Sequence, residues 1–334
     1  MSRILRRRRR TQAGFTLIEL MISLLMFSFA VAGILAVATT LARGFRDQKV
    51  TVGAEGAARA AMDYIGDAIR GSSPAVSTGN IQALYDSGCT DPLVGNTVLV
   101  TESFTAPDDL TIVFASGSVA TSLAAPFAGG TTMTVTDASQ LASGDMVLVS
   151  DFARGHLAKI NSVAGSTLTL APQACSAPVW PATGTYAQGA VVVRALRARF
   201  FIRALDLIPT LWMDPDAEGP AVEEPLAEGV EDFQVAVGID SNNDGVINEG
   251  PGTGVVAGDD EWVLNVAGET LPAPPYTIRA LRLTLVAITV GPQTGIPSFY
   301  RPAAGDRAAG TVPDNYRRRV LTSTIEVRNL VGSP

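Results

Sequence analysis

The chain has 334 residues, of which 47% are hydrophobic and 17% are charged, and its formal net charge is -7. This balance supplies enough apolar material for a sizeable core and excludes a globally disordered chain. Six arginines stand in the first ten residues; without them 19 basic residues face 32 acidic ones, so the rest of the chain carries -13. Because neutralising phosphates requires Lys and Arg, we expect no nucleic-acid binding by this acidic part.

An apolar run follows the arginine-rich start. Residues 20–41 contain no charged residue, and a helix over this run would measure about 33 Å, enough to cross the hydrocarbon of a bilayer. Arginines precede the run and the next one is Arg43, so the positive-inside bias predicts a cytoplasmic N-terminus. A secretory signal peptide is the alternative, but the run is longer than a signal core and no A-x-A site closes it.

Two residues at the start of this run indicate processing. Gly14 stands between the basic leader and the apolar run, so cleavage after it would remove the charges and keep the helix. Glu19 places a carboxylate at the edge of the apolar run, a costly position that requires a cationic partner. Cleavage would supply one, because the new amine of Phe15 is cationic and lies four residues from Glu19 on one helical face. The pair could form within a chain or between neighbouring helices, where it would set their register.

The arginine-rich leader, the segment from Gly14 to Met21 (GFTLIELM) and the apolar helix together resemble the class III signal of type IV prepilins. The resemblance implies that prepilin peptidase cleaves between Gly14 and Phe15 and methylates the Phe15 amine. It also implies that Glu19 is the acidic residue required for efficient assembly. The alternative is an ordinary single-pass anchor that matches by chance.

Helical spacing continues beyond the apolar run. Apolar residues recur at steps of three and four, at Ala58, Ala61, Met62, Ile65, Ala68 and Ile69. This pattern predicts an amphipathic extension that ends near Gly71. We therefore expect a cleaved leader over residues 1–14, a transmembrane and assembly helix over 15–42, an amphipathic extension over 43–70 and a β-rich head over 71–334.

Short segments with strand character and turn residues fill the head. The expected strands are residues 96–101, 110–115, 131–136, 145–150, 157–163, 166–170, 191–202, 231–239, 278–290 and 318–330. Residues from about 125 to 190 could form a small inserted β-module, with a hairpin turn at Ala164-Gly165. In the last strand, Leu321 and Ile325 alternate with Thr322 and Glu326, which predicts a sheet with one solvent-exposed face. The expected fold is α+β, a long helix packed on an antiparallel sheet.

The late strands add to the resemblance. Residues 228–235, a loop rich in Asp, Asn and Gly, residues 278–288 and residues 317–321 resemble the carboxyl half of PilW-type minor pilins, and so do residues 144–151. The resemblance implies a minor pilin that primes assembly at the pilus tip. Its implied partners are prepilin peptidase, other minor and major pilins, the inner-membrane assembly platform and membrane lipid.

A calcium site is a further hypothesis. Asp240, Asn242 and Asp244, followed by Gly245, fit the start of an EF-hand-type loop. The twelfth position holds Pro251 instead of an acid, and Glu249 is displaced by two places. The alternative is an Asx-rich loop between strands, capped by its own side chains.

The remaining polar groups suggest no enzyme. His156 is the only histidine and no G-x-S-x-G surrounds a serine, so we expect a surface-loop histidine. Cys89 and Cys175 could form a disulfide if the head is exported. A type II secretion pseudopilin is the main alternative function, although the largest pseudopilins generally lack the acid found here at Glu19. A membrane-anchored adhesin, hydrolase or binding protein is the third.

Overall fold

A computed structural model describes residues 15–72, 76, 81–83, 97–171, 185–217, 222–242, 244–250, 254–256, 258–272, 278–293 and 297–327. The chain divides into two compact units, residues 1–50 and 51–334. Helix α1 begins at Leu17 in the first unit and ends at Arg70 in the second. It makes up almost all of the described part of the first unit. One long N-terminal helix with sheets that are mainly antiparallel confirms the predicted α+β class.

The part of α1 in the second unit buries one stripe. The six apolar residues predicted to share a face, from Ala58 to Ile69, are each at most 9% exposed. Three of them are alanines, which allow strands to approach the helix axis closely. The helix ends as predicted: the Gly71 amide donates to the Asp67 carbonyl, and the Ala115 amide donates to the Gly71 carbonyl, which ties the helix end to a strand.

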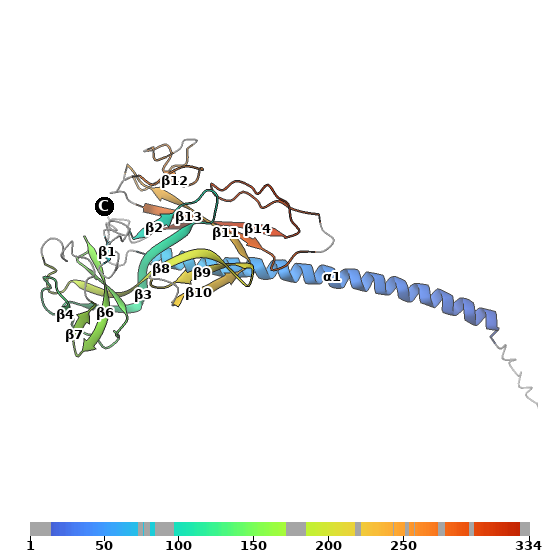
Figure 1. Ribbon diagram of the computed structural model, residues 1–334, viewed down its shortest axis with the longest axis horizontal. Helices are drawn as coiled ribbons and strands as arrows, with labels where there is room; N and C mark the ends of the chain where they lie inside the picture. Colours follow the sequence, from blue (N-terminus) through green and yellow to red (C-terminus); the bar gives the residue numbers. More distant parts are fainter. Residues whose placement is uncertain are drawn as a thin grey trace, which may run out of the picture. The chain divides into compact units, whose positions relative to one another are not determined.

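The strands of the second unit form two sheets (Figure 1). The larger contains β1 (Ile81–Ala83), β2 (Val98–Thr101), β3 (Asp109–Ser122), β4 (Thr132–Thr134), β5 (Met146–Ser150), β6 (Gly155–Ala164), β7 (Thr167–Leu170), β8 (Val191–Leu205), β9 (Ile208–Asp214) and β10 (Glu224–Glu228). The smaller has the order β12 (Trp262–Val263), β11 (Val230–Ile239), β13 (Ile278–Ile288) and β14 (Arg318–Glu326). Among the described strands, β1 and β6 pair in parallel and the other pairs are antiparallel.

Strand β8 is shared by two parts of the larger sheet. Along one edge, its residues 191–195 pair with β5 and its residues 199–205 pair with β9. Its other edge pairs with β3 over most of its length. The 15 residues of β8 therefore connect the helix-covered part of the sheet to the strands β4 to β7.

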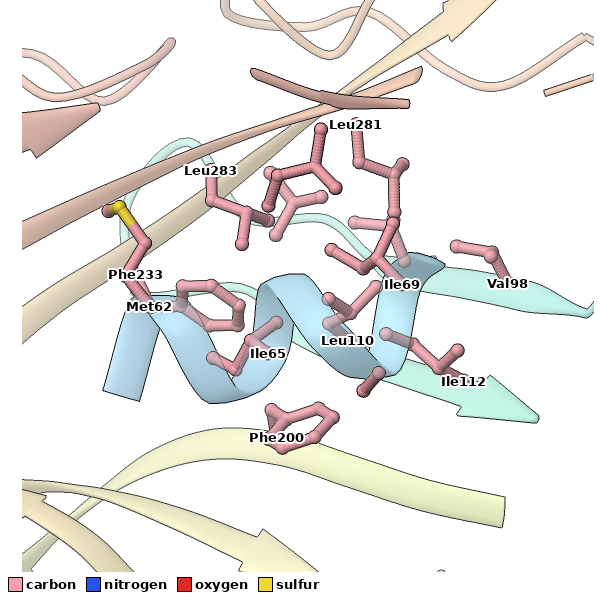
Figure 2. Packing of buried hydrophobic residues seen from close by; sticks show 14 of the residues in the cluster. Met62, Ile65, Ile69, Val98, Leu110, Ile112, Phe200, Phe233, Leu281 and Leu283 are labelled. Carbon is pink, nitrogen blue, oxygen red and sulfur yellow. The ribbon is translucent and has the colours of Figure 1, made fainter. Parts of the chain in front are cut away.

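The main core lies where α1 meets both sheets. Figure 2 shows Ile65 and Ile69 of the helix, with Phe200 of β8 on one side and Leu281 and Leu283 of β13 on the other. All five side chains are fully buried. The helix thus packs between two sheets, whereas the sequence led us to expect one. Burying each such side chain stabilises the fold by about 1.5–3 kcal/mol.

A second core belongs to the segment for which an inserted module was predicted. Its buried residues run from Leu123 to Val192 and include Phe127, Leu168 and Tyr186. The predicted hairpin at Ala164-Gly165 is confirmed, because β6 and β7 pair on either side of it. Strands β4 to β7 remain hydrogen-bonded to the larger sheet through β5 and β8, so the segment extends this sheet rather than forming a separate one.

His156 lies in this second core, and the expectation of a surface-loop histidine is wrong. Its side chain sits in β6, is 3% exposed and shares a hydrogen bond between Nδ1 and the Tyr186 hydroxyl. Burial, aided by the charge of Arg154, lowers the pKa of His156 to about 4. The histidine is therefore a neutral core residue, 30 positions from its partner.

The second face of the smaller sheet is covered by the loop before β14. Asp232 of β11 is fully buried, and its carboxylate accepts hydrogen bonds from Arg301 at 2.8 Å and forms an ion pair with Arg307 at 2.9 Å. The same carboxylate accepts from the Gln234 amide at 3.0 Å. In β14 the burial alternates from Leu321 onward, which confirms one exposed face for that strand.

Buried carboxyl groups lie beside this ion-pair cluster. Asp108 accepts from the amides of Ser103 and Val235, yet burial raises its pKa to about 7. Burial, the facing Asp306 carboxyl and nearby acids raise the pKa of Glu102 well above its usual range. The carboxyl oxygens of Glu102 and Asp306 are shielded from solvent and receive no donor from the described residues. This surrounding favours the protonated form of Glu102.

A close backbone contact joins the two sheets at Gly229, between β10 and β11. Its amide donates to the Pro209 carbonyl and its carbonyl accepts from Ile288. Its φ is +74°, and a Cβ there would stand 2.6 Å from the Ile288 carbonyl oxygen. Only glycine fits this position without strain.

We expect Gly229→Ala to lower the stability of the full chain in detergent micelles, measured as thermal unfolding by tryptophan fluorescence. Gly165→Ala is the matched control, because Gly165 has a φ of +61° and a Cβ added there would meet no heavy atom within 4 Å. The control bears only the backbone cost, of about 1–3 kcal/mol. Gly229→Ala should cost at least about 1 kcal/mol more. Equal losses would contradict a role for the close contact.

We also expect stability to fall as the pH rises from about 5 to about 9. The raised pKa values of Glu102 and Asp108 mean that the folded chain holds these protons more tightly than the unfolded chain. Their contribution is complete below the unfolded pKa of about 4 and is lost as the pH rises through the folded values. Glu102→Gln should make the melting temperature less dependent on pH, whereas Glu326→Gln, at an exposed position of β14, should not. Parallel pH profiles for the wild type and Glu102→Gln would refute the raised pKa of Glu102.

Candidate functional site

The first turn of α1 carries a capping box formed by Thr16 and Glu19. The Thr16 amide and hydroxyl each donate to Glu19 Oε2 at 3.0 Å, and the Glu19 amide donates to the Thr16 hydroxyl at 3.3 Å. The Leu20 amide donates to the Thr16 carbonyl at 3.2 Å, which makes Thr16 the N-cap of the helix. The two side chains satisfy helix-start amides that would otherwise lack partners.

Phe15 precedes this cap and is 84% exposed. The sequence predicted that Phe15 and Glu19 share one helical face, but the helix begins at Leu17. The reason is that Thr16 takes the N-cap conformation, which leaves Phe15 outside the helix. Glu19 nevertheless lies close to the Phe15 nitrogen along the chain, because its carboxylate already binds the next amide.

The rest of the apolar run satisfies its own polar groups. Ser23 donates to the Glu19 carbonyl at 2.7 Å, Ser28 donates to Leu24 at 2.8 Å, and Thr40 donates to Ala36 at 2.9 Å. These bonds leave no serine or threonine hydroxyl among them to be paired by lipid. Among the described residues, one helix, α1, is both long enough and apolar enough to cross a membrane. No part of its most apolar stretch is buried.

The predicted calcium residues Asp240, Asn242 and Asp244 lie together in one turn. Asp240 accepts from the amides of Asp244 and Gly245, and Asp244 accepts from Val246. Asp240 is buried, and its Oδ2 also binds the Arg279 guanidinium at 2.9 Å. The turn is thus held by its own side chains and by an arginine, the arrangement of an Asx-rich loop.

Glu249, the fourth predicted ligand, points to another partner. Its carboxylate forms two 2.8 Å hydrogen bonds to Arg282, which lies over the ring of Trp262 at 4.1 Å. The pairing with Arg282 lowers the pKa of Glu249. Within the described ranges, no group of three or more His, Cys, Asp or Glu side chains is arranged to hold a metal. Calcium binding stays a prediction, and it would require Glu249 to leave Arg282.

Glu261 closes the same loop and was not among the four predicted calcium ligands. It is fully buried and accepts from Ser241 at 3.0 and 2.9 Å and from Asn248 at 3.2 Å. Burial alone would raise its pKa, but the four hydrogen bonds outweigh burial and lower it. Glu261 stands directly before β12, a strand of two residues that was not predicted from the sequence.

Three predicted site residues, Gly14, Cys89 and Cys175, lie outside the described residues. The cleavage position is therefore placed only by its neighbour Phe15, and the disulfide stays a prediction.

Comparison with known proteins bears on both ends of the chain. Residues 9–38 match the family model of the prokaryotic N-terminal methylation motif, and residues 199–329 match that of the type IV pilus-assembly protein W. The second match begins within β8 and continues through β14, including the whole smaller sheet; residues 144–151 lie outside it. No curated protein and no solved structure matched. By these two matches, the chain is similar to PilW-like prepilins.

Proposed function

We propose that this type IV pilus-related, pilin-like protein is a minor pilin that primes pilus assembly at the tip. Before assembly it would lie in the inner membrane, with its N-terminus in the cytoplasm and its head in the periplasm. The observation that carries the proposal is the capped carboxylate of Glu19 at the start of an exposed apolar helix, directly after Gly14 and Phe15.

The chemistry of processing explains why this carboxylate is placed here. Hydrolysis of the Gly14–Phe15 amide would release the six leader arginines and leave a cationic amine on Phe15. That amine would form one residue before the Thr16 amide, which already donates to Glu19. In a low-dielectric surrounding, an acid without a counter-charge is costly, and an amine from a neighbouring chain would offset that cost. The pair would favour one axial register between packed helices.

The head supports a structural role rather than catalysis. The PilW family is an assembly component, and Asp232, Asp240 and Glu261 are held in ion pairs or turn caps. A head of two sheets is also bulky for a subunit repeated along a filament, which favours a minor position. Prepilin peptidase, other pilins and the assembly platform are the partners that this role requires.

Mass spectrometry of the mature chain tests the processing step. We expect an N-terminus at Phe15 that carries one added methyl group, and no leader arginines. Gly14→Leu should leave the leader attached, because the peptidase recognises the residue at this position. The Ala13→Leu variant should still be cleaved. An intact Met1 in the wild type, or cleavage elsewhere, would contradict the proposed function.

The two roles of Glu19, cap and charge, can be separated. Glu19→Gln keeps a capping side chain at this position and removes the charge, whereas Thr16→Ala removes the cap, at about 1 kcal/mol, and keeps the charge. If Glu19 pairs with an amine, Glu19→Gln should lower recovery of the chain in sheared pili about tenfold or more, and Thr16→Ala should change it little. All variants should remain membrane-bound and cleaved. The reverse ranking would show that Glu19 acts through the helix cap.

A further inference from the structure

A recess of about 440 Å³ opens on the second unit beside the start of its helix segment. It is lined by Thr51, Phe299, Tyr300, Pro302 and residues 317–319. Phe299 and Tyr300 are 42% and 58% exposed, unusual values for large aromatic side chains on one short loop. The recess therefore combines an aromatic wall with three consecutive arginines.

One of the three arginines is engaged in ion pairs, and the other two are exposed. Arg318 is almost buried and binds Glu231 and Asp314, with distances between 2.5 and 3.1 Å. Its neighbours Arg317 and Arg319 are exposed. Neither has an ion-pair partner among the described residues. With the acids Glu231 and Asp314 included, the three arginines leave the recess with a net positive charge.

The chain itself limits how far this recess can be from the membrane. Thr51 follows Ala42, the end of the apolar run, by nine residues. Nine residues span about 14 Å as helix and at most about 30 Å when fully extended. The same short stretch holds Arg43, Arg46 and Lys49 against one acid, Asp47, so it carries a net charge of +2.

We propose that this recess binds the phosphate headgroup of an anionic phospholipid before assembly, while the subunit is inserted in the membrane. Guanidinium groups pair with phosphate through two parallel hydrogen bonds, and both exposed arginines line the same recess. Tyr side chains favour the headgroup level of a bilayer, because their ring is apolar and their hydroxyl stays hydrated. The proposal rests on the membrane insertion of the proposed function and adds a lipid contact made by the head.

Native mass spectrometry of the full chain in a zwitterionic detergent tests this contact, with phosphatidylglycerol as the probe and phosphatidylcholine as the neutral comparison. Each arginine near an anionic lipid contributes about fivefold in affinity. We therefore expect the double variant Arg317→Gln/Arg319→Gln to bind phosphatidylglycerol about 25-fold more weakly. The matched control is Arg59→Gln/Arg70→Gln, which removes two exposed helix arginines outside the recess. Unchanged melting temperatures establish that all variants fold.

Equal loss of phosphatidylglycerol binding in both double variants would overturn the proposal, and so would displacement of the lipid by millimolar inorganic phosphate, which would indicate a site for free anions. A photoreactive phenylalanine analogue in place of Tyr300, cross-linked in cells, should yield a lipid adduct; an adduct with another protein would overturn it. Carbonate extraction of the membranes is scored separately. A chain that is extracted contradicts the proposed function, whereas an inserted chain without lipid preference contradicts only the contact.

Discussion

The burial of one helical stripe between two sheets is the constraint on which the rest of the head depends. Ala58, Ile65 and Ile69 are completely shielded from solvent, and residues from both sheets share their cluster. A helix with larger residues at the alanine positions would hold the sheets apart. Because the two sheets meet on the helix, each sheet buries part of the apolar inner face of the other. Without its neighbour, neither sheet would keep that face covered. The smaller sheet, which carries the family match, is thus held in place by the larger.

Polar groups then fix the outer layer of the smaller sheet. The Asp232 carboxylate draws Arg301 and Arg307 onto β11, so the long loop before β14 closes over that face. Replacing only one partner of such a buried pair is costly, since an uncompensated charge remains. The same loop presents Phe299 and Tyr300 to solvent. A buried ionic cluster on one side of the loop therefore holds an exposed aromatic pair on the other.

Local patterns in the sequence predicted much of this fold. The buried stripe of α1 was predicted from apolar residues that recur at steps of three and four. The exposed face of β14 was predicted from an alternation with a period of two. The hairpin of β8 and β9 was missed because its turn, Asp206-Leu207, lacks glycine, although both residues adopt positive φ. The burial of His156 was missed because it depends on Tyr186, 30 residues away. Glu249 was assigned to calcium because its partner, Arg282, is 33 residues further along. By contrast, the Thr16-x-x-Glu19 capping box was legible in the sequence and was overlooked in favour of the charge.

The shared strand β8 has a mechanical consequence. One end of β8 is bonded to β5 and the other to β9, without a break in the strand. Tension applied along β8 would be resisted by its hydrogen bonds to β3 acting together in shear, because these bonds run perpendicular to the strand. A flexible linker at this place would stretch instead. The strands β4 to β7 are therefore coupled stiffly to the helix-bearing core.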